Sequence, residues 1–151
     1  MKLIPVDPAN EDHVKFLYEC FLSRPDDARV SSKGQKPTFD EHREFVANHP
    51  YADWCLIERY SGGGFAVPPV IIGAIGLTPP PRPSVHGNEI GVDILPLFRG
   101  QRYADDAIQL MMDKHGPGVY MAHVARDNYT SMALFKRLGF EQVQMTFTVE
   151  V

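Results

Sequence analysis

Residues 89–104 read EIGVDILPLFRGQRYA, and this stretch decides the fold. Its first half is apolar, as in a strand, and its second half starts a helix with Ala104, Ala107, Ile108 and Met111 on one face. A short Arg-Gly loop joins the two halves. Such a loop directs several backbone N–H groups to one point, and the helix dipole adds positive potential there. The stretch therefore predicts an anion site, although an ordinary strand-to-helix turn has the same pattern.

A second informative segment, residues 128–140, reads NYTSMALFKRLGF and follows an apolar run at 119–125. Asn128 is a favourable N-cap. Gly139 is a favourable C-cap, because glycine adopts the left-handed conformation that often closes helices. The segment predicts a strand over 119–125, followed by a short helix with Phe135 on its inner face.

The remaining elements follow from hydrophobic periodicity and capping residues. Asn10 predicts the start of a helix, and Thr38 with Glu41 predicts a capping box at the start of a second one. The apolar positions of these two helices are Val14, Leu17, Tyr18, Phe21, Phe45 and Val46. Strands are expected at 2–6, 54–60, 70–77 and 89–95, and a half-buried final strand at 142–151, where apolar and polar residues alternate. The Gly- and Pro-rich stretches 61–69 and 78–83 are expected loops, and the order is β-α-α-β-β-β-α-β-α-β.

Composition restricts the function classes. The chain has 151 residues, 44% of them hydrophobic, which predicts a single domain over 1–151. A net charge of −4 argues against a nucleic-acid surface. Cys20 and Cys55 are too few for a disulfide framework or a four-cysteine zinc site and are expected to be buried free thiols, and the histidines are too scattered for a metal site. Without an apolar leader or a membrane-length run, a soluble cytoplasmic protein is expected.

The two segments together, in this order and about two dozen residues apart, resemble the GNAT superfamily of N-acyltransferases. The acyl-CoA motif of that family reads (Q/R)-x-x-G-x-(G/A), and its second motif combines an Asn, a helix with an aromatic residue, and Leu-Gly-Phe. The resemblance covers nearly the whole chain. It implies an α+β fold, in which a mixed, mostly antiparallel sheet has flanking helices and its fourth and fifth strands splay apart around acetyl-CoA.

The resemblance also implies cofactor-binding residues. Ile94 and Leu95 would offer backbone groups to the pantetheine arm and the thioester. The pyrophosphate would be wrapped by Arg99, Gly100, Gln101, Arg102, Tyr103 and Ala104. Asn128 would reach the CoA arm, and Phe135 would lie near its sulfur.

Two positions depart from the family pattern. Arg102 replaces a usual Gly. The backbone at a helix N-terminus is expected to be ordinary, so that an Arg fits, and its charge could help to hold a phosphate. Phe135 stands where many members carry a Tyr that protonates the departing thiolate, and Phe cannot donate a proton. Another group, or water, must then do so, unless the chain is not an acetyltransferase.

Aminolysis of a thioester needs a group that accepts a proton from the amine. Glu89 and, on the same strand face, Asp93 are the candidate bases. Tyr129 and His123 are the candidate proton donors. His42, His49 and His86 are expected on the surface or in a substrate wall, and Ser31, Ser32 and Lys33 in a solvated loop or an acceptor site.

The resulting interpretation is an N-acetyltransferase that uses acetyl-CoA and no metal. It would act on a primary amine of a small molecule by direct attack in a ternary complex. A looser likeness of residues 38–58 to bacterial members that acylate small amino compounds makes an amino sugar one candidate. The alternatives are a degenerate domain that binds CoA or a partner without catalysis, and an enzyme that acts on a protein N-terminus. No nucleic acid or membrane partner is expected, and a homodimer stays open.

Overall fold

The computed structural model describes residues 1–25, 36–60, 68–79, 87–145, 147 and 149. At its centre is a five-stranded sheet in the order β1-β2-β3-β4-β5. Neighbouring strands are antiparallel, except that β4 and β5 are parallel. The strands are β1 (Lys2–Pro5), β2 (Asp53–Arg59), β3 (Val70–Thr78), β4 (Asn88–Ile94) and β5 (Tyr120–Met121). The expected α+β fold with a mixed, mostly antiparallel sheet is confirmed.

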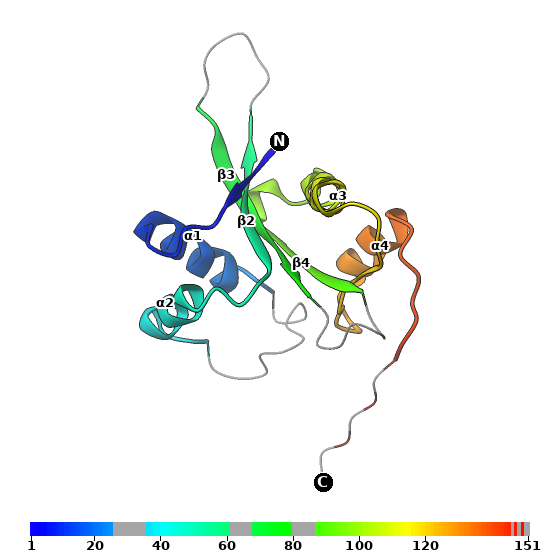
Figure 1. Cartoon of the computed structure of the whole chain (residues 1–151). Coiled ribbons are helices and arrows are strands. Elements are labelled where there is room, and N and C mark those ends of the chain that lie inside the picture. The colour runs from blue at the N-terminus through cyan, green and yellow to red at the C-terminus, as the bar shows by residue number, and fades with distance from the viewer. Residues whose placement is uncertain (26–35, 61–67, 80–86, 146, 148, 150–151) are drawn as a thin grey trace.

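Helices cover both faces of this sheet, α1 and α2 on one face and α3 and α4 on the other (Figure 1). Asn10 and Thr38 cap the first two helices, and Thr38 forms the predicted capping box with Glu41. These caps satisfy amides that a helix N-terminus leaves without partners. The helices are α1 (Glu11–Leu22), α2 (Phe39–Ala47), α3 (Tyr103–His115) and α4 (Tyr129–Arg137), with a 3₁₀ helix, η2 (Pro96–Phe98), before α3. No helix among the described residues is long and apolar enough to cross a bilayer.

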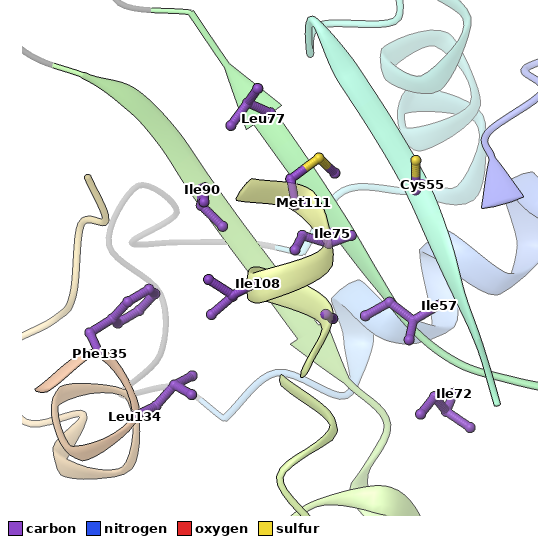
Figure 2. Close-up of a cluster of buried hydrophobic side chains, with 11 residues drawn as sticks. Cys55, Ile57, Ile72, Ile75, Leu77, Ile90, Ile108, Met111, Leu134 and Phe135 are labelled. Carbon is purple, nitrogen blue, oxygen red and sulfur yellow. The ribbon is translucent and has the colours of Figure 1, made fainter. Parts of the chain in front are cut away.

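Strand alternation divides the apolar side chains between two cores. On β2, Cys55 and Ile57 face the core under α3 and α4, whereas Trp54 and Leu56 face the core under α1 and α2. Figure 2 shows the first of these cores, where side chains from β2, β3 and β4 meet those of α3 and α4. Three residues of α3 that were expected to face inward are 0% exposed: Ala107, Ile108 and Met111. Cys20 and Cys55 are buried free thiols, as expected.

The C-terminal segment departs from the prediction. Residues 141–145 form no strand, and the segment runs away from the sheet after α4 (Figure 1). Its described apolar side chains are 67–89% exposed: Val143, Met145, Phe147 and Val149. A strand needs a neighbour that satisfies its backbone groups, and β5, at two residues, is too short to provide a ladder. The expected half-buried strand is therefore wrong for the described part, and the strand expected over 119–125 is confined to β5.

Several expectations fall on residues that the structure does not describe. Most of the two loops predicted at 61–69 and 78–83 lies there. So do Ser31, Ser32, Lys33 and His86.

A polar cluster joins the C-terminal end of α3 to the start of β2. The Asp53 carboxylate accepts hydrogen bonds from His115 Nε2 at 2.8 Å and from Cys55 Sγ at 3.3 Å, and it pairs with Lys114 Nζ. Partial burial raises the pKa of Asp53, but the hydrogen bonds from Lys114, His115 and Cys55 lower it further, so the net pKa lies below its ordinary value. The cluster fixes α3 against the sheet at the end opposite to its N-terminus.

We expect Asp53→Asn to lower the free energy of unfolding by about 1–2 kcal/mol at neutral pH, because Lys114 and His115 lose a charged partner. The pKa of Asp53 is lower in the folded than in the unfolded chain. Its contribution is therefore complete above the unfolded pKa of about 3.9 and is lost as pH falls through the folded value. Urea unfolding of both proteins at pH 7 and at about pH 2.5 should show a difference in stability that narrows in acid. A difference of equal size at both pH values would contradict the assignment.

Candidate functional site

The parallel strands β4 and β5 separate after a short contact. Their register pairs Asn88 with Tyr120 and Glu89 with Met121, and residues 122–125 are not paired with β4. The splay expected between the fourth and fifth strands is present. Beyond Glu89, the edge of β4 that faces β5 has no partner strand among the described residues.

Backbone hydrogen bonds show which residues of β4 face this gap. The amide of Asn88 donates to Val119 on the β5 side, and the amide of Leu95 donates to Ile72 of β3. The direction of backbone groups alternates along a strand in an antiparallel ladder. The residues whose backbone groups face the gap are therefore Ile90, Val92 and Ile94.

The two residues expected to contact pantetheine are partly engaged within the protein. The Leu95 amide donates to Ile72, and the Leu95 carbonyl accepts from the Phe98 amide, both at 2.9 Å. The Ile94 carbonyl accepts from Arg99 Nε at 2.8 Å. The edge therefore offers the Ile94 amide and the backbone of Val92 rather than the groups of Leu95.

The loop between β4 and α3 has the geometry of an anion site. Gly100 has a φ of +76°, and no atom lies within 4 Å of the position that a Cβ would take. The amides of residues 101–105 donate no hydrogen bond within the described ranges, and the α3 dipole adds positive potential at this end. The Arg99 guanidinium also donates to the Ser23 carbonyl at 3.0 Å. Arg99 thus ties the end of β4 to the end of α1 and leaves the anion site to the backbone amides.

Arg102 precedes α3 in a left-handed conformation, with φ 62° and ψ 13°. The expectation of an ordinary backbone at this position is wrong. The chain reverses sharply between the loop and the helix, and glycine adopts this conformation without the steric cost of about 1–2 kcal/mol that other residues pay. The side chain of Arg102 is exposed.

We expect Arg102→Gly to raise the free energy of unfolding by about 1 kcal/mol, because it removes this backbone strain. Arg102→Ala keeps the Cβ and should give no such gain. Both variants lose the charge of Arg102. The difference between their free energies of unfolding, measured by chemical denaturation, therefore isolates the backbone strain. Equal stabilisation by Ala and Gly would show that strain is not the cause.

The start of α4 contains two predicted site residues. The Asn128 side chain accepts a hydrogen bond from the Ser131 amide at 3.0 Å and so caps the helix. Its amide nitrogen is the part that could reach a ligand. Tyr129, a candidate proton donor, is 73% exposed in the first turn.

The Leu-Gly-Phe triplet closes α4 in a Schellman motif. The Phe140 amide donates to the Phe135 carbonyl at 3.0 Å, and the Gly139 amide donates to the Lys136 carbonyl at 3.1 Å. Gly139 has a φ of +84°. The rings of Phe135 and Phe140 pack edge to face, 5.1 Å apart. The triplet therefore stabilises the helix end, and Phe135 lies buried in the core with no proton to donate.

Glu89 and His123 lie together where β4 and β5 begin to separate. Oε2 of Glu89 is 3.9 Å from Nε2 of His123, and the side chains are 43% and 55% exposed. The sequence suggested Glu89 as a base and His123 as a proton donor. The structure brings them within ion-pair distance of each other.

Asp93, the other candidate base, has both oxygens engaged. The Arg24 guanidinium donates to Asp93 Oδ1 from Nε at 2.8 Å and to Oδ2 from Nη2. Protonation of Asp93 would break this pair, which makes Asp93 less suited than Glu89 to accept a proton. Arg24 itself lies over the ring of Phe21, 5.2 Å from its centroid.

A cavity of about 340 Å³ lies on the same face of β4. Strands β3 and β4 line one side, with Gly91 and Asp93 on β4, and helices α1 and α2 line the other. No atom lies within 4 Å of the position that a Cβ on Gly91 would take. Five of the remaining lining residues have aromatic rings: Phe21, His42, Phe45, Tyr51 and Trp54.

Close ring contacts hold this aromatic wall in place. Tyr51 packs on Trp54 with centroids 4.7 Å apart, and Phe45 packs on Trp54 at 5.9 Å. A Cβ on Gly76 would lie 2.8 Å from Cδ1 of Tyr51, so glycine is needed under that ring. Cys20 also lines the cavity, and burial, with a smaller contribution from Asp93, raises the pKa of its thiol to about 12.

Sequence reasoning did not single out Arg24, Tyr51 or Trp54. Arg24 meets Asp93 across 69 residues, and no local pattern signals such a contact. Gly91 carried a usable signal, because it shares strand parity with Glu89 and Asp93. Within the described ranges, no group of three His, Cys, Asp or Glu side chains is placed to hold a metal ion.

Strands β4 and β5 splay apart, and α3 between them starts with amides that have no partner among the described residues, which is the arrangement that the family resemblance implies. The model of the acetyltransferase (GNAT) domain family matches residues 3–141. The chain therefore belongs to the GNAT acetyltransferase family, whose members are transferases of the acyltransferase class. In a comparison with curated proteins, no sequence matches significantly.

Solved structures share this fold at low sequence identity. A domain from Methanocaldococcus jannaschii is 16% identical with a TM-score of 0.74, over 96% of this chain and 92% of that one. A spermidine N-acetyltransferase chimera from Vibrio cholerae SpeG and hSSAT is 17% identical with a TM-score of 0.67, over 95% and 84%. The aminoglycoside 6'-N-acetyltransferase AAC(6')-IG from Acinetobacter haemolyticus is 16% identical with a TM-score of 0.57, over 100% and 98%.

Proposed function

We propose that the protein is an N-acetyltransferase that moves the acetyl group of acetyl-CoA to the primary amine of a small molecule. The observation that carries this proposal is the position of Glu89 and His123. They lie at the start of the split between β4 and β5, and Glu89 shares its parity on β4 with Gly91 and Asp93, which line the cavity. Acetyl-CoA would bind along the open edge of β4, and the amine would enter from the cavity side.

Acetyl-CoA supplies an activated thioester, and the described residues fit its parts. The backbone of Val92 and the Ile94 amide can pair with the pantetheine arm as an added strand would. The amides of residues 101–105 can hold the pyrophosphate at the α3 N-terminus. Gly100 leaves open space for it, and the exposed Arg102 adds a positive charge. Asn128, which caps α4, and Phe135 within α4 would approach the CoA arm from the other side.

Glu89 and His123 divide the proton transfers between them. Glu89 takes a proton from the substrate ammonium, which frees the nitrogen lone pair to form the new N–C bond. The C–S bond breaks with its electron pair on sulfur. The second proton, lost by the nitrogen as the amide forms, passes to the sulfur through His123. One proton thus leaves to solvent, and the other ends on the thiol of CoA.

Transfer without a covalent enzyme intermediate is supported by the state of the cysteines. Burial raises the pKa of both Cys20 and Cys55 to about 12. The thiolate is the nucleophilic form, and at neutral pH it is essentially absent at these positions. The amine therefore attacks directly within a ternary complex.

A small acceptor is supported by the size of the cavity, since about 340 Å³ lies at the lower end of the range for small-molecule sites. Solved structures of similar fold include enzymes named for spermidine and for aminoglycosides, which are both amines. An amino sugar remains within this class of acceptor.

The proposal is tested by calorimetry with acetyl-CoA and by release of free CoA thiol in the presence of primary amines. We expect acetyl-CoA to bind, and at least one small primary amine to raise the rate of thiol release. Binding without turnover across amino sugars, arylalkylamines and polyamines would favour a CoA-binding domain without catalysis, which the lack of a hydroxyl on Phe135 would explain. No heat at millimolar acetyl-CoA would contradict both functions.

A further inference from the structure

His42 is a buried histidine in the cavity wall with one ring nitrogen that has no partner. Its exposed fraction is 5%, and Nε2 forms no hydrogen bond within the described part of the chain. A buried polar atom left in this state costs about 1–3 kcal/mol, and native proteins contain few of them. The ring belongs to a cavity wall while Nε2 itself is covered by its neighbours, so a small shift of the ring would let a ligand in that cavity supply the partner.

The other ring nitrogen determines what kind of partner Nε2 requires. The backbone of Val14 on α1 acts on the His42 ring as a hydrogen-bond partner that raises its pKa, which favours the ring as the donor. Burial lowers the pKa of His42, the bond to Val14 raises it, and the charge of Arg24 lowers it again, so that the net pKa lies below its ordinary value. The ring is therefore neutral, with its proton on Nδ1 and a lone pair on Nε2. Nε2 thus needs a hydrogen-bond donor.

The donor to Nε2 could be a hydroxyl of the acceptor or an ammonium group in addition to the reacting amine. The charges around the cavity distinguish the two. The carboxylates among the described lining residues already have partners: Asp93 pairs with Arg24, and Glu41 accepts from Thr38 in the capping box. A second ammonium group on the acceptor would find no unengaged carboxylate among these residues to compensate its charge. A hydroxyl is neutral and donates one hydrogen bond, which matches Nε2.

The body of the ligand is constrained by the aromatic wall. Phe45, Tyr51 and Trp54 form a connected set of rings around the cavity. Flat or apolar groups pack well against such rings, whereas a flexible polyamine chain would lose much rotational freedom there.

We propose that His42 is a specificity residue that accepts a hydrogen bond at Nε2 from a hydroxyl of the acceptor. The preferred acceptors are then primary amines with a ring body and a hydroxyl group rather than polyamines. This inference rests on the proposed function, in that the occupant of the cavity is the acceptor.

The experiment compares two amines that differ by one hydroxyl, tyramine and phenethylamine, with spermidine as the polyamine. Binding to the full-length chain is measured by calorimetry, and the ¹⁵N resonance of His42 Nε2 is followed in ¹⁵N-histidine-labelled protein. Both readouts are independent of turnover. We expect tyramine to bind at least about tenfold more tightly than phenethylamine or spermidine, because a site built for a hydroxyl rejects an analogue without it. The Nε2 resonance should move with tyramine and not with phenethylamine.

Variants connect this preference to His42. In His42→Leu the affinity ratio between the two amines should fall to about one, and in His42→Gln, whose amide oxygen can accept a hydrogen bond, part of the preference should return. His13→Leu is the matched control: it removes a histidine on α1 that is absent from the cavity lining, and it should leave the ratio unchanged. Urea unfolding of each variant establishes that it is folded.

The outcomes separate this inference from the proposed function. Equal affinity for the two amines, no binding of either, tighter binding of spermidine, or a preference that survives in His42→Leu would overturn the role of His42. A hydroxyl preference that depends on His42, without any release of CoA thiol, would support the binding site and contradict the proposed acetyltransferase activity.

Discussion

Replacing Glu89 with Gln should lower kcat by about 10²–10⁴-fold, the usual contribution of a general base. Glutamine keeps the shape of the side chain and removes its capacity to accept a proton. The affinity for acetyl-CoA should barely change, since Glu89 lies on the cavity side of β4. Raising the pH should restore part of the activity, because more of the amine then arrives without its extra proton. Steady-state kinetics across pH, with calorimetry for acetyl-CoA, measure all three effects.

Two further variants make this result specific. Glu44→Gln removes an exposed carboxylate from α2 and should have native kinetics. Asp93→Asn distinguishes the two candidate bases, because Asp93 and Glu89 are about 13 Å apart along the strand and only one can lie beside the reacting amine. Native activity in Glu89→Gln together with loss of activity in Asp93→Asn would assign the base to Asp93 instead.

Gly91→Leu should lower kcat/KM for the acceptor by about 10–100-fold, since forcing extra methylene groups into an occupied space costs about 1–3 kcal/mol. The leucine side chain would project from β4 into the open space of the cavity, between Glu89 and Asp93. The loss should lie mainly in KM for the amine. Binding of acetyl-CoA on the edge of β4 should persist.

The fold is not expected to suffer from this change, because glycine inside a strand is itself unfavourable. Gly91→Ala serves as the control of smaller volume and should have a KM close to that of the native protein. If Gly91→Leu leaves the acceptor KM unchanged, the amine does not use this cavity, and the acceptor route must lie elsewhere.

Local sequence patterns were sufficient to predict much of the fold. Asn10 and Thr38 cap helices where the sequence predicts, because a cap depends only on the side chain and the next three amides. The buried face of α3 follows from the spacing of Ala107, Ile108 and Met111. Parity along β4 placed Glu89 and Asp93 on one face, and Gly91 and Asp93 together line the cavity.

The C-terminal segment shows the limit of such patterns. Alternation of apolar and polar residues over 142–151 identifies a sequence able to form a half-buried strand. Whether the strand forms depends on a neighbour that satisfies its backbone groups, and β5 is too short to do so. Periodicity carries no information about that neighbour.

The sequence by itself determined the order of the elements up to α4, the family and the segments that border the two halves of the site. Only the tertiary structure decided the left-handed backbone of Arg102, the pair of Arg24 with Asp93, the approach of His123 to Glu89 and the unpartnered nitrogen of His42. The physical reason is the range of the interactions. Capping and periodicity act over a few residues, whereas these four features depend on which distant groups the packed sheet and helices bring into contact.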